Sequence, residues 1–224
     1  RDPMKAQPST LLLSLLVTAF AVSAQSPIYS GVQPGTTNFL GGFVYTNTPT
    51  PITQLFDVTV VDPSGITVTE FEVNTSTSHG TNGVFEVWIT ALGGTHVGNQ
   101  TTPSAWTQVA TQSVTHNGGT VSYLLPTPIT LPTGTYGMAL HYVGANPIYT
   151  NPTTQTPPLP QTYSTAEVTL DMSAARIRTS DTTGPFGGTA AGFSPRHPNL
   201  AMPYLSGVVS VDFDGTPTRG ATPL

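Results

Sequence analysis

The chain contains no cysteine, and its single lysine, Lys5, lies near the N-terminus. The absence of cysteine excludes disulfide bonds, so the fold must be stable through packing alone. A chain of about 200 residues can bury enough apolar surface to do so. Without lysine after position 5, the remainder cannot form the Lys–Asn isopeptide bonds that strengthen some bacterial surface modules. If the chain is exported, the lack of disulfides favours a bacterial source.

Charged residues are scarce and make up 8% of the chain. After residue 24, four basic residues stand against ten acidic ones, which gives a net charge of −6; the four are Arg176, Arg178, Arg196 and Arg219. Nucleic-acid binding needs clustered Lys and Arg that displace counterions from phosphates. Four scattered arginines do not supply this, so we expect no nucleic acid among the partners. Anionic membrane surfaces are disfavoured for the same reason.

The longest apolar run covers the 14 residues 11–24. Lys5 precedes it, and Val22 and Ala24 occupy the −3 and −1 positions of a cleavage site, as in a secretory signal peptide. The run is shorter than the about 20 residues of a membrane-spanning helix. We therefore predict upstream residues plus a signal peptide over 1–24, cleaved near Ala24. The mature chain is expected outside the cell or at its surface, with one domain over 25–213 and a flexible tail over 214–224.

Threonine occurs 40 times, and glycine and proline 22 times each. Threonine is β-branched and suits a pleated, half-solvated face, whereas glycine and proline favour tight turns. No 3.6-residue apolar period follows the signal peptide. The sequence therefore predicts an all-β fold, a two-sheet β-sandwich of about nine strands. Its topology is expected to be a jelly roll or an immunoglobulin-like Greek key.

Apolar alternation assigns faces to several strands. Ile66 and Val68 alternate on one face but Phe71 and Val73 on the other, so a β-bulge near 69–70 is predicted to restore a common face. In the next run, Phe85, Val87 and Ile89 are expected to point inward, opposite Glu86 and Trp88; in the run 135–144, Tyr136, Met138, Leu140 and Tyr142 share one face. A final strand is expected over 204–213. The Pro-rich segment 145–161 is longer than ordinary loops.

Four stretches, read in order, resemble an uncharacterised β-sandwich module of secreted or cell-surface bacterial proteins: FDVTV, ITVTEFEVN, EVWITALGGTHVGNQTTPSAWTQVA and PFGGTAAGFSPR. The resemblance spans about residues 55–213. The chain departs from the module's pattern at His197-Pro198-Asn199-Leu200, where the module has an aromatic residue and Asn-Gly. The resemblance implies the fold and the extracellular location, and it implies no catalytic residue.

Arg196 and His197 stand together between Pro195 and Pro198. One interpretation is an anion or sugar clamp, with planar bidentate donors from the arginine and a switchable donor from the histidine. The other is structural: Arg196 pairs with a carboxylate on a neighbouring strand while the prolines hold the chain. We favour the structural interpretation, because an arginine in an apolar segment of so weakly charged a chain is expected to be paired.

Metal binding has little support in the sequence. The five histidines are widely spaced and show no zinc-binding pattern: His79, His96, His116, His141 and His197. Asp212 and Asp214 before Gly215 form half of a calcium loop but lack its further ligands. We expect no cofactor, with incidental calcium at these two aspartates as the weak candidate.

Aromatic side chains are the other candidate binding groups. Trp88, Trp106, Tyr142 and Tyr149 can stack on sugar rings if one face exposes them; otherwise they belong to the core. Hydrolysis has weaker support. Gly192-Phe193-Ser194 begins like a nucleophile elbow but has Arg196 in place of the closing glycine. Glu70 and Glu72 face the same way, and the separation of their carboxylates is on the scale of a glycosidase pair. The same spacing is also common on solvated strand faces.

These observations lead to two functional hypotheses. The first is a non-enzymatic structural or adhesive unit of the cell surface or extracellular matrix, whose partners are copies of itself or other surface proteins. Residues 25–38, or the tail from Gly215, are predicted to add a strand to a neighbouring copy and so to build filaments. The alternative is a carbohydrate-binding module that uses exposed aromatic residues. Hydrolase activity ranks third.

Overall fold

The computed structural model describes eight segments of the chain, residues 26–33, 36–44, 51–76, 82–179, 184–187, 192–206, 209–211 and 217–219. The predicted signal peptide, His79 and the calcium candidates Asp212 and Asp214 lie outside these segments. Within them, no helix has the length and apolar character needed to cross a membrane.

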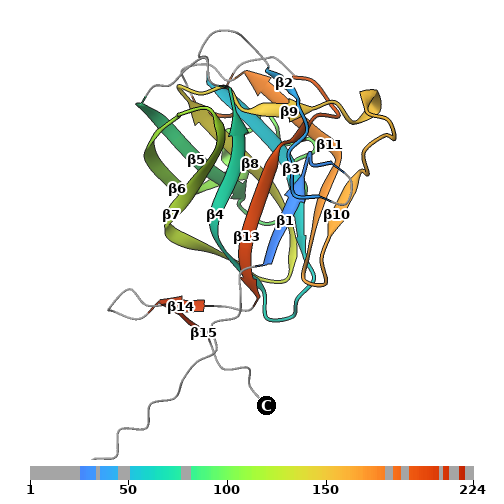
Figure 1. Ribbon diagram of the computed structural model, residues 1–224. Coiled ribbons are helices and arrows are strands. Elements are labelled where there is room, and N and C mark those ends of the chain that lie inside the picture. The colour runs from blue at the N-terminus through green and yellow to red at the C-terminus, as the bar shows by residue number, and fades with distance from the viewer. Residues whose placement is uncertain are drawn as a thin grey trace, which may run out of the picture.

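Two antiparallel sheets form a β-sandwich, as predicted (Figure 1). The first sheet has four strands in the order β1 (Ser26–Ser30), β13 (Leu200–Ser206), β4 (Ile66–Thr75) and β7 (Gly119–Leu131). The second has six, in the order β10 (Thr162–Ser164), β11 (Val168–Thr179), β3 (Ile52–Val60), β8 (Gly134–Val143), β5 (Asn82–Thr90) and β6 (Trp106–Thr115). The two sheets thus contain ten strands, close to the nine expected.

The strand order is that of a jelly roll. Eight strands form the jelly roll, and along the chain they are β1, β3, β4, β5, β6, β7, β8 and β13. When they are numbered one to eight in this order, the first sheet reads 1-8-3-6. The second sheet, without β10 and β11, reads 2-7-4-5. This is the arrangement of two interleaved Greek keys, and it selects the first of the two predicted topologies. Strands β10 and β11 belong to an insertion between β8 and β13 and extend the second sheet beyond β3.

Shorter elements complete the described chain. The Pro-rich segment 145–161 contains β9 (Ile148–Thr150) and a 3-10 turn, η3 (Pro152–Thr154); a second 3-10 turn, η2 (Pro103–Ala105), precedes β6. Strand β9 pairs with β2 (Phe43–Val44) and β12 (His197–Pro198) in a small third sheet. The final predicted strand is divided into β13 and β14 (Val209–Val211). Part of the predicted tail forms β15 (Pro217–Arg219), which pairs with β14.

The core lies between the two large sheets. Phe85 and Val87 point into it as predicted, with Met138, Leu140 and Tyr142 from β8, whereas Ile89 and Tyr136 are only partly buried against it. The ring of Phe85 stacks on Tyr123 with centroids 4.4 Å apart and so joins β5 to β7 across the sandwich.

The β-bulge predicted near residues 69–70 is confirmed, because the register between β4 and β7 shifts between Val68 and Glu70. As a result, Ile66, Val68, Phe71 and Val73 all reach the core despite their change of phase. One extra residue at the bulge restores a common face, since side-chain direction alternates with a period of two.

Candidate functional site

The outer face of the six-stranded sheet is covered by a second, smaller apolar cluster. Leu55 pairs in register with Ala139, and Ala139 with Trp88, so these side chains lie in one row across β3, β8 and β5. Phe186 covers the row. Its ring stacks on Trp106 with centroids 4.5 Å apart and meets Trp88 edge-on at 5.5 Å.

Three of the four aromatic residues considered for sugar stacking are used for packing. Trp106 is 6% exposed and donates its indole N–H to the carbonyl of Asn99 at 2.8 Å. Tyr142 is fully buried in the main core and donates its hydroxyl to Oε1 of Gln54. Trp88 is partly buried under Phe186 and donates to Glu86. A joint exposed face of these residues is therefore not formed, because the segments 91–105 and 184–187 cover this side of the sheet.

Arg178 is a central residue of this covered face that the sequence analysis did not single out. Its side chain is fully buried, and it donates to the carbonyls of Gln100 and, at 2.5 Å, Gly187. These carbonyls belong to the two segments that cover the sheet, so one guanidinium holds both. The available signal was Arg178 itself, one of only four arginines after residue 24, placed directly after the apolar Ile177 of β11.

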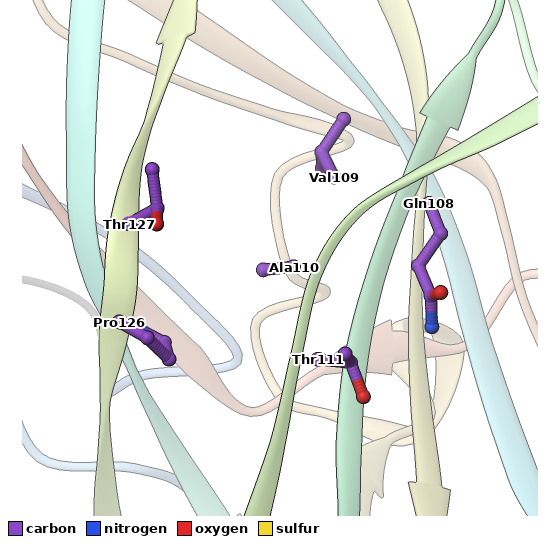
Figure 2. A pocket seen from close by; sticks show the side chains of 6 residues that line it. All are labelled: Gln108, Val109, Ala110, Thr111, Pro126 and Thr127. Carbon is purple, nitrogen blue, oxygen red and sulfur yellow. The ribbon is translucent and has the colours of Figure 1, made fainter.

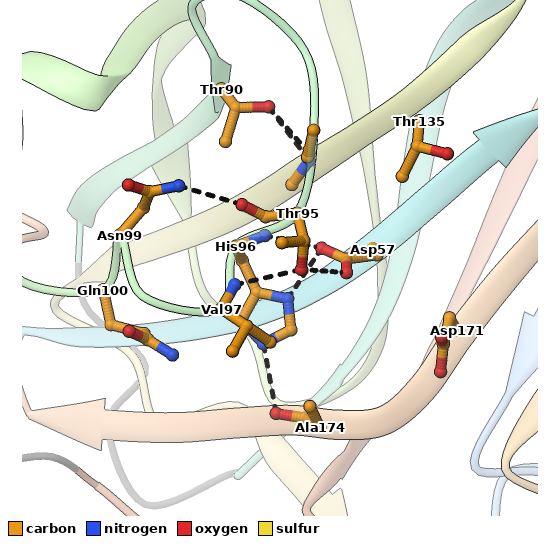
Figure 3. Close-up of polar contacts among 12 residues, drawn as sticks. Asp57, Thr90, Thr95, His96, Val97, Asn99, Gln100, Thr135, Asp171 and Ala174 are labelled. Atoms are coloured by element: carbon orange, nitrogen blue, oxygen red, sulfur yellow. Dashed lines mark hydrogen bonds and ion pairs between the residues drawn. The ribbon is translucent and has the colours of Figure 1, made fainter.

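Asp57 and His96 form a buried polar network beside this cluster (Figure 3). Asp57 on β3 accepts hydrogen bonds from the backbone N–H and Nδ1 of His96, both at 2.7 Å, and from the hydroxyl of Thr95. Nε2 of His96 lies 3.1 Å from the carbonyl oxygen of Ala174 on β11. Burial by itself raises the pKa of Asp57, but the hydrogen bonds from His96 and Thr95 outweigh it and lower that pKa.

This geometry suits a structural role for the pair. A catalytic histidine that is oriented by an aspartate needs its second ring nitrogen free for a substrate or nucleophile. In His96 both ring nitrogens face oxygen acceptors of the protein itself. The network therefore attaches the segment 91–105 to β3 and β11, and it presents no base to a ligand.

Gly137 is the close-packing position under this network. A methyl group there would lie 2.6 Å from the backbone nitrogen of His96 and 2.8 Å from Cγ2 of Thr90. We expect Gly137→Ala to lower the free energy of unfolding by about 2 kcal/mol, because the backbone of His96 is fixed and cannot retreat. Urea unfolding measures the change. The matched control is Gly41→Ala, where a methyl group has no neighbour within 4 Å. Equal losses in the two variants contradict the packing argument.

The four described histidines are all buried, and each contacts a hydrogen-bonding group of the protein. Nδ1 of His116 lies 2.6 Å from the hydroxyl of Tyr123, Nδ1 of His141 lies 2.9 Å from that of Thr53, and His197 faces Tyr163 at 3.3 Å. Burial lowers the pKa of His116, and it lowers those of His141 and His197 to about 4. In the described part of the chain, no three His, Asp or Glu side chains converge as a metal site.

Arg196 and Tyr149 are the two predicted site residues that the fold brings together at the surface. The guanidinium carbon lies 5.7 Å from the ring centre of Tyr149 and 5.5 Å from that of Phe193. Among the described residues, no carboxylate forms an ion pair with Arg196. The expected carboxylate partner is thus replaced by two aromatic faces. His197 points elsewhere and is fully buried, so the two neighbours do not form a joint clamp.

The described surface also has two open grooves. One, of about 270 Å³, lies between the sheet edges β6 and β7, where Gln108 to Thr111 face Pro126 and Thr127 and no charged side chain takes part (Figure 2). The other, of about 350 Å³, lies over the outer face of the four-stranded sheet and is lined by Tyr29, Thr37, Asn38, Phe39, Glu72, Asn74 and Thr120.

The two hydrolase candidates have structural partners or surroundings. Glu70 accepts a hydrogen bond from Ser122 at 2.8 Å, and Glu72 lines the larger groove. Ser194 donates its hydroxyl to the carbonyl of Ala174, and the element that follows it is strand β12, so it does not occupy a strand-to-helix turn.

Comparison with protein-family models gave no match, and no curated protein is significantly similar to the chain. The class of protein defined by the described residues is therefore that of its fold, an all-β jelly roll.

Proposed function

We propose that the chain is an exported, non-enzymatic structural or adhesive unit that assembles with copies of itself by exchanging strand β1. The observation behind the proposal is the position of β1. It is an edge strand with one hydrogen-bonded neighbour, β13, and cleavage near Ala24 would leave it at the N-terminus of the mature chain. The apolar run of residues 11–24 supports export.

The contacts of β1 with its own chain are few. Ile28 is its one large aliphatic side chain in the main core. Ser30 adds a hydrogen bond to the carbonyl of Pro198. Burial of one isoleucine is worth only about 1.5–3 kcal/mol. Such a strand can leave and be replaced by the same strand of another copy.

The opposite edge of the same sheet is protected against strand addition. That edge is β7, which contains Pro126 and Pro128. Proline removes backbone donors and is a common means of blocking edge pairing. An exposed β13 is thus the acceptor that the four-stranded sheet offers. The predicted donor segment 25–38 begins with a strand that already belongs to its own sheet, so its deletion is expected to weaken the domain as well as to stop assembly.

A reversible covalent lock tests the exchange. Tyr29 and Ala201 are register partners in β1 and β13, and antiparallel partners have Cα atoms about 4.5–5.5 Å apart, within disulfide range. In the double variant Tyr29→Cys/Ala201→Cys, oxidation of dilute monomer is expected to hold β1 in its own sheet and to abolish filaments in negative-stain microscopy. Reduction is expected to restore them. No native cysteine competes for the bond.

The same variant distinguishes exchange from other modes of contact. Oxidation after assembly is expected to link copies, which gives a ladder of covalent oligomers on a non-reducing gel. The single variant Tyr29→Cys is the matched control and should form no ladder. Filaments that persist in the locked monomer, or an assembled state that yields only monomeric disulfides, contradict strand exchange. Isolated particles in every preparation contradict self-assembly itself.

A further inference from the structure

Aromatic rings lie near Arg196 at one end of the sandwich, and two of them are exposed. We call Phe43, Tyr149, Phe193 and Arg196 the aromatic–arginine patch. Phe43 on β2 and Tyr149 on β9 are register partners with ring centres 6.0 Å apart. Phe43 is 51% exposed and Phe193 53% exposed. Strands β2 and β9 lie near the upper end of the sandwich in Figure 1, close to the loops.

Arg196 is incompletely satisfied within this patch. It lies near the rings of Tyr149 and Phe193. Its backbone N–H donates to the carbonyl of Ala175, and among the described residues its side chain donates from Nη1 to the carbonyl of its neighbour Pro195 at 2.7 Å. Its Nε is buried and has no hydrogen-bond partner there. A partly buried charge without a counter-ion is unfavourable. Arg178 is fixed by carbonyls of its own chain, whereas Arg196 lies beside exposed aromatic rings and has no carboxylate partner in the described part of the chain, so it is a candidate binding group for an anionic ligand.

We propose that the aromatic–arginine patch binds a carboxylate-bearing sugar, a uronic acid unit of an acidic polysaccharide. The guanidinium binds the carboxylate through parallel N–H donors, as arginine commonly does. The exposed rings of Phe43 and Phe193 provide flat apolar surfaces for the C–H faces of the pyranose rings on either side. Together the two features select an acidic sugar over a neutral one.

The composition of the patch favours a glycan over an acidic polypeptide. One cation stands among three aromatic rings, so that a ligand meets a single charge and much flat apolar surface. A run of acidic peptide side chains would need several cations. The net charge of the chain is negative, so general attraction to polyanions is also absent, and binding depends on this one arginine.

The inference adds a ligand to the unit proposed above, and it rests on that function only for its biological setting. Binding is measured on unassembled protein, whereas assembly is measured by particle size. A mature chain that forms no filaments but binds acidic glycans refutes strand exchange alone. A chain that forms filaments but binds no acidic glycan refutes the patch alone.

Calorimetric titration of the mature chain with oligogalacturonate tests the proposal, and the methyl ester of the same oligosaccharide is the matched uncharged ligand. We expect binding of the acid and at least about tenfold weaker binding of the ester, as for loss of a charged hydrogen bond. Arg196→Gln should weaken binding of the acid by a similar factor. Phe193→Ala should weaken it about threefold to tenfold. Leu124→Ala, an exposed apolar residue on β7 of the other sheet, should leave it unchanged.

Several results overturn the proposal. Equal affinity for the acid and the ester removes the role of the carboxylate, and unchanged binding by Arg196→Gln removes that of the arginine. Equally tight binding of polyglutamate shows a general polyanion site in place of a sugar site. Because Arg196 also contacts its own loop, thermal unfolding of each variant is compared. If Arg196→Gln does not fold, the acid–ester comparison on the unmodified chain and Phe193→Ala still decide the question.

Discussion

Acidification from pH 6.5 to pH 4 is expected to lower the free energy of unfolding by about 6 kcal/mol. Burial lowers the pKa of both His141 and His197 from 6.5 to about 4 in the folded chain. In the unfolded chain both keep their ordinary pKa, so between these two values the unfolded state binds more protons. Each shift corresponds to about 3 kcal/mol, since one pKa unit is about 1.4 kcal/mol. The stability is fully present above pH 6.5 and is lost as the pH falls to 4.

The environment of each ring explains why it stays neutral. His197 is fully buried in β12, and His141 lies on β8 beneath Pro185, whose carbonyl accepts a hydrogen bond from Thr53. Desolvation is the largest cause of the lowered pKa of each ring, because burial disfavours the protonated, charged form. Asp57 affects stability over a lower pH range. Because its pKa is lowered in the folded chain, its contribution is lost only as the pH falls below its ordinary pKa of 3.8.

Urea unfolding at several pH values between 7.5 and 4 measures this loss. The variant His197→Gln serves as the control, because it removes one titrating group and keeps an amide in its place. Its stability at neutral pH is expected to fall, but its slope against pH should be shallower than that of the unmodified chain, because His116 and His141 still titrate and His197 no longer does. A free energy of unfolding that stays constant within about 1 kcal/mol over this range refutes the assignment of neutral buried histidines.

Replacement of Arg178 is expected to have the second largest effect. Its guanidinium joins Gln100 and Gly187 to β11, and its loss leaves two carbonyls without their donor inside a covered face. We expect Arg178→Met to lower the free energy of unfolding by about 3–5 kcal/mol. Arg178→Lys should recover only part of this, because a single ammonium group lacks the planar fork that reaches both carbonyls.

Hydrogen exchange localises the effect. In Arg178→Met, the amides of residues 95–101 and 184–187 are expected to lose protection, whereas the core strand β4 should keep its own until global unfolding. The surface variant Leu124→Ala is the control for general destabilisation. Uniform loss of protection, or a change below about 1 kcal/mol, contradicts a role for Arg178 in holding the two segments.

Features that depend on neighbouring residues were predictable from the sequence, and contacts between distant residues were not. The bulge near residue 69 was predictable because it follows from the alternation of neighbouring side chains. Burial of Trp106 was the favoured expectation, but the residue that buries it was not predictable, because Phe186 lies 80 residues further along the chain. The same applies to Arg196. Its own sequence neighbourhood indicated an ion pair, but its guanidinium lies near the ring of Phe193, three residues earlier, and near that of Tyr149, which the fold brings from 47 residues away.

The residues that carry the resemblance also show that a pattern in the chain becomes interpretable once distant contacts are known. Asn99, Trp106, Phe186 and Gly187 come together over the outer face of the six-stranded sheet, where they hydrogen-bond, stack or accept from Arg178. Their pattern in the chain therefore corresponds to packing of this face. The resemblance itself, and the extracellular location that it implies, remain predictions.

The sequence by itself determined the all-β class, the faces of β4, β5 and β8 and the bulge, because these depend on composition and on contacts between residues two or three positions apart. Only the tertiary structure decided the jelly-roll order, the covered outer face and the aromatic surroundings of Arg196. The physical reason is that strand pairing, stacking and counter-ions join residues far apart in the chain. Which of many compatible partners each side chain meets depends on the packing of the whole.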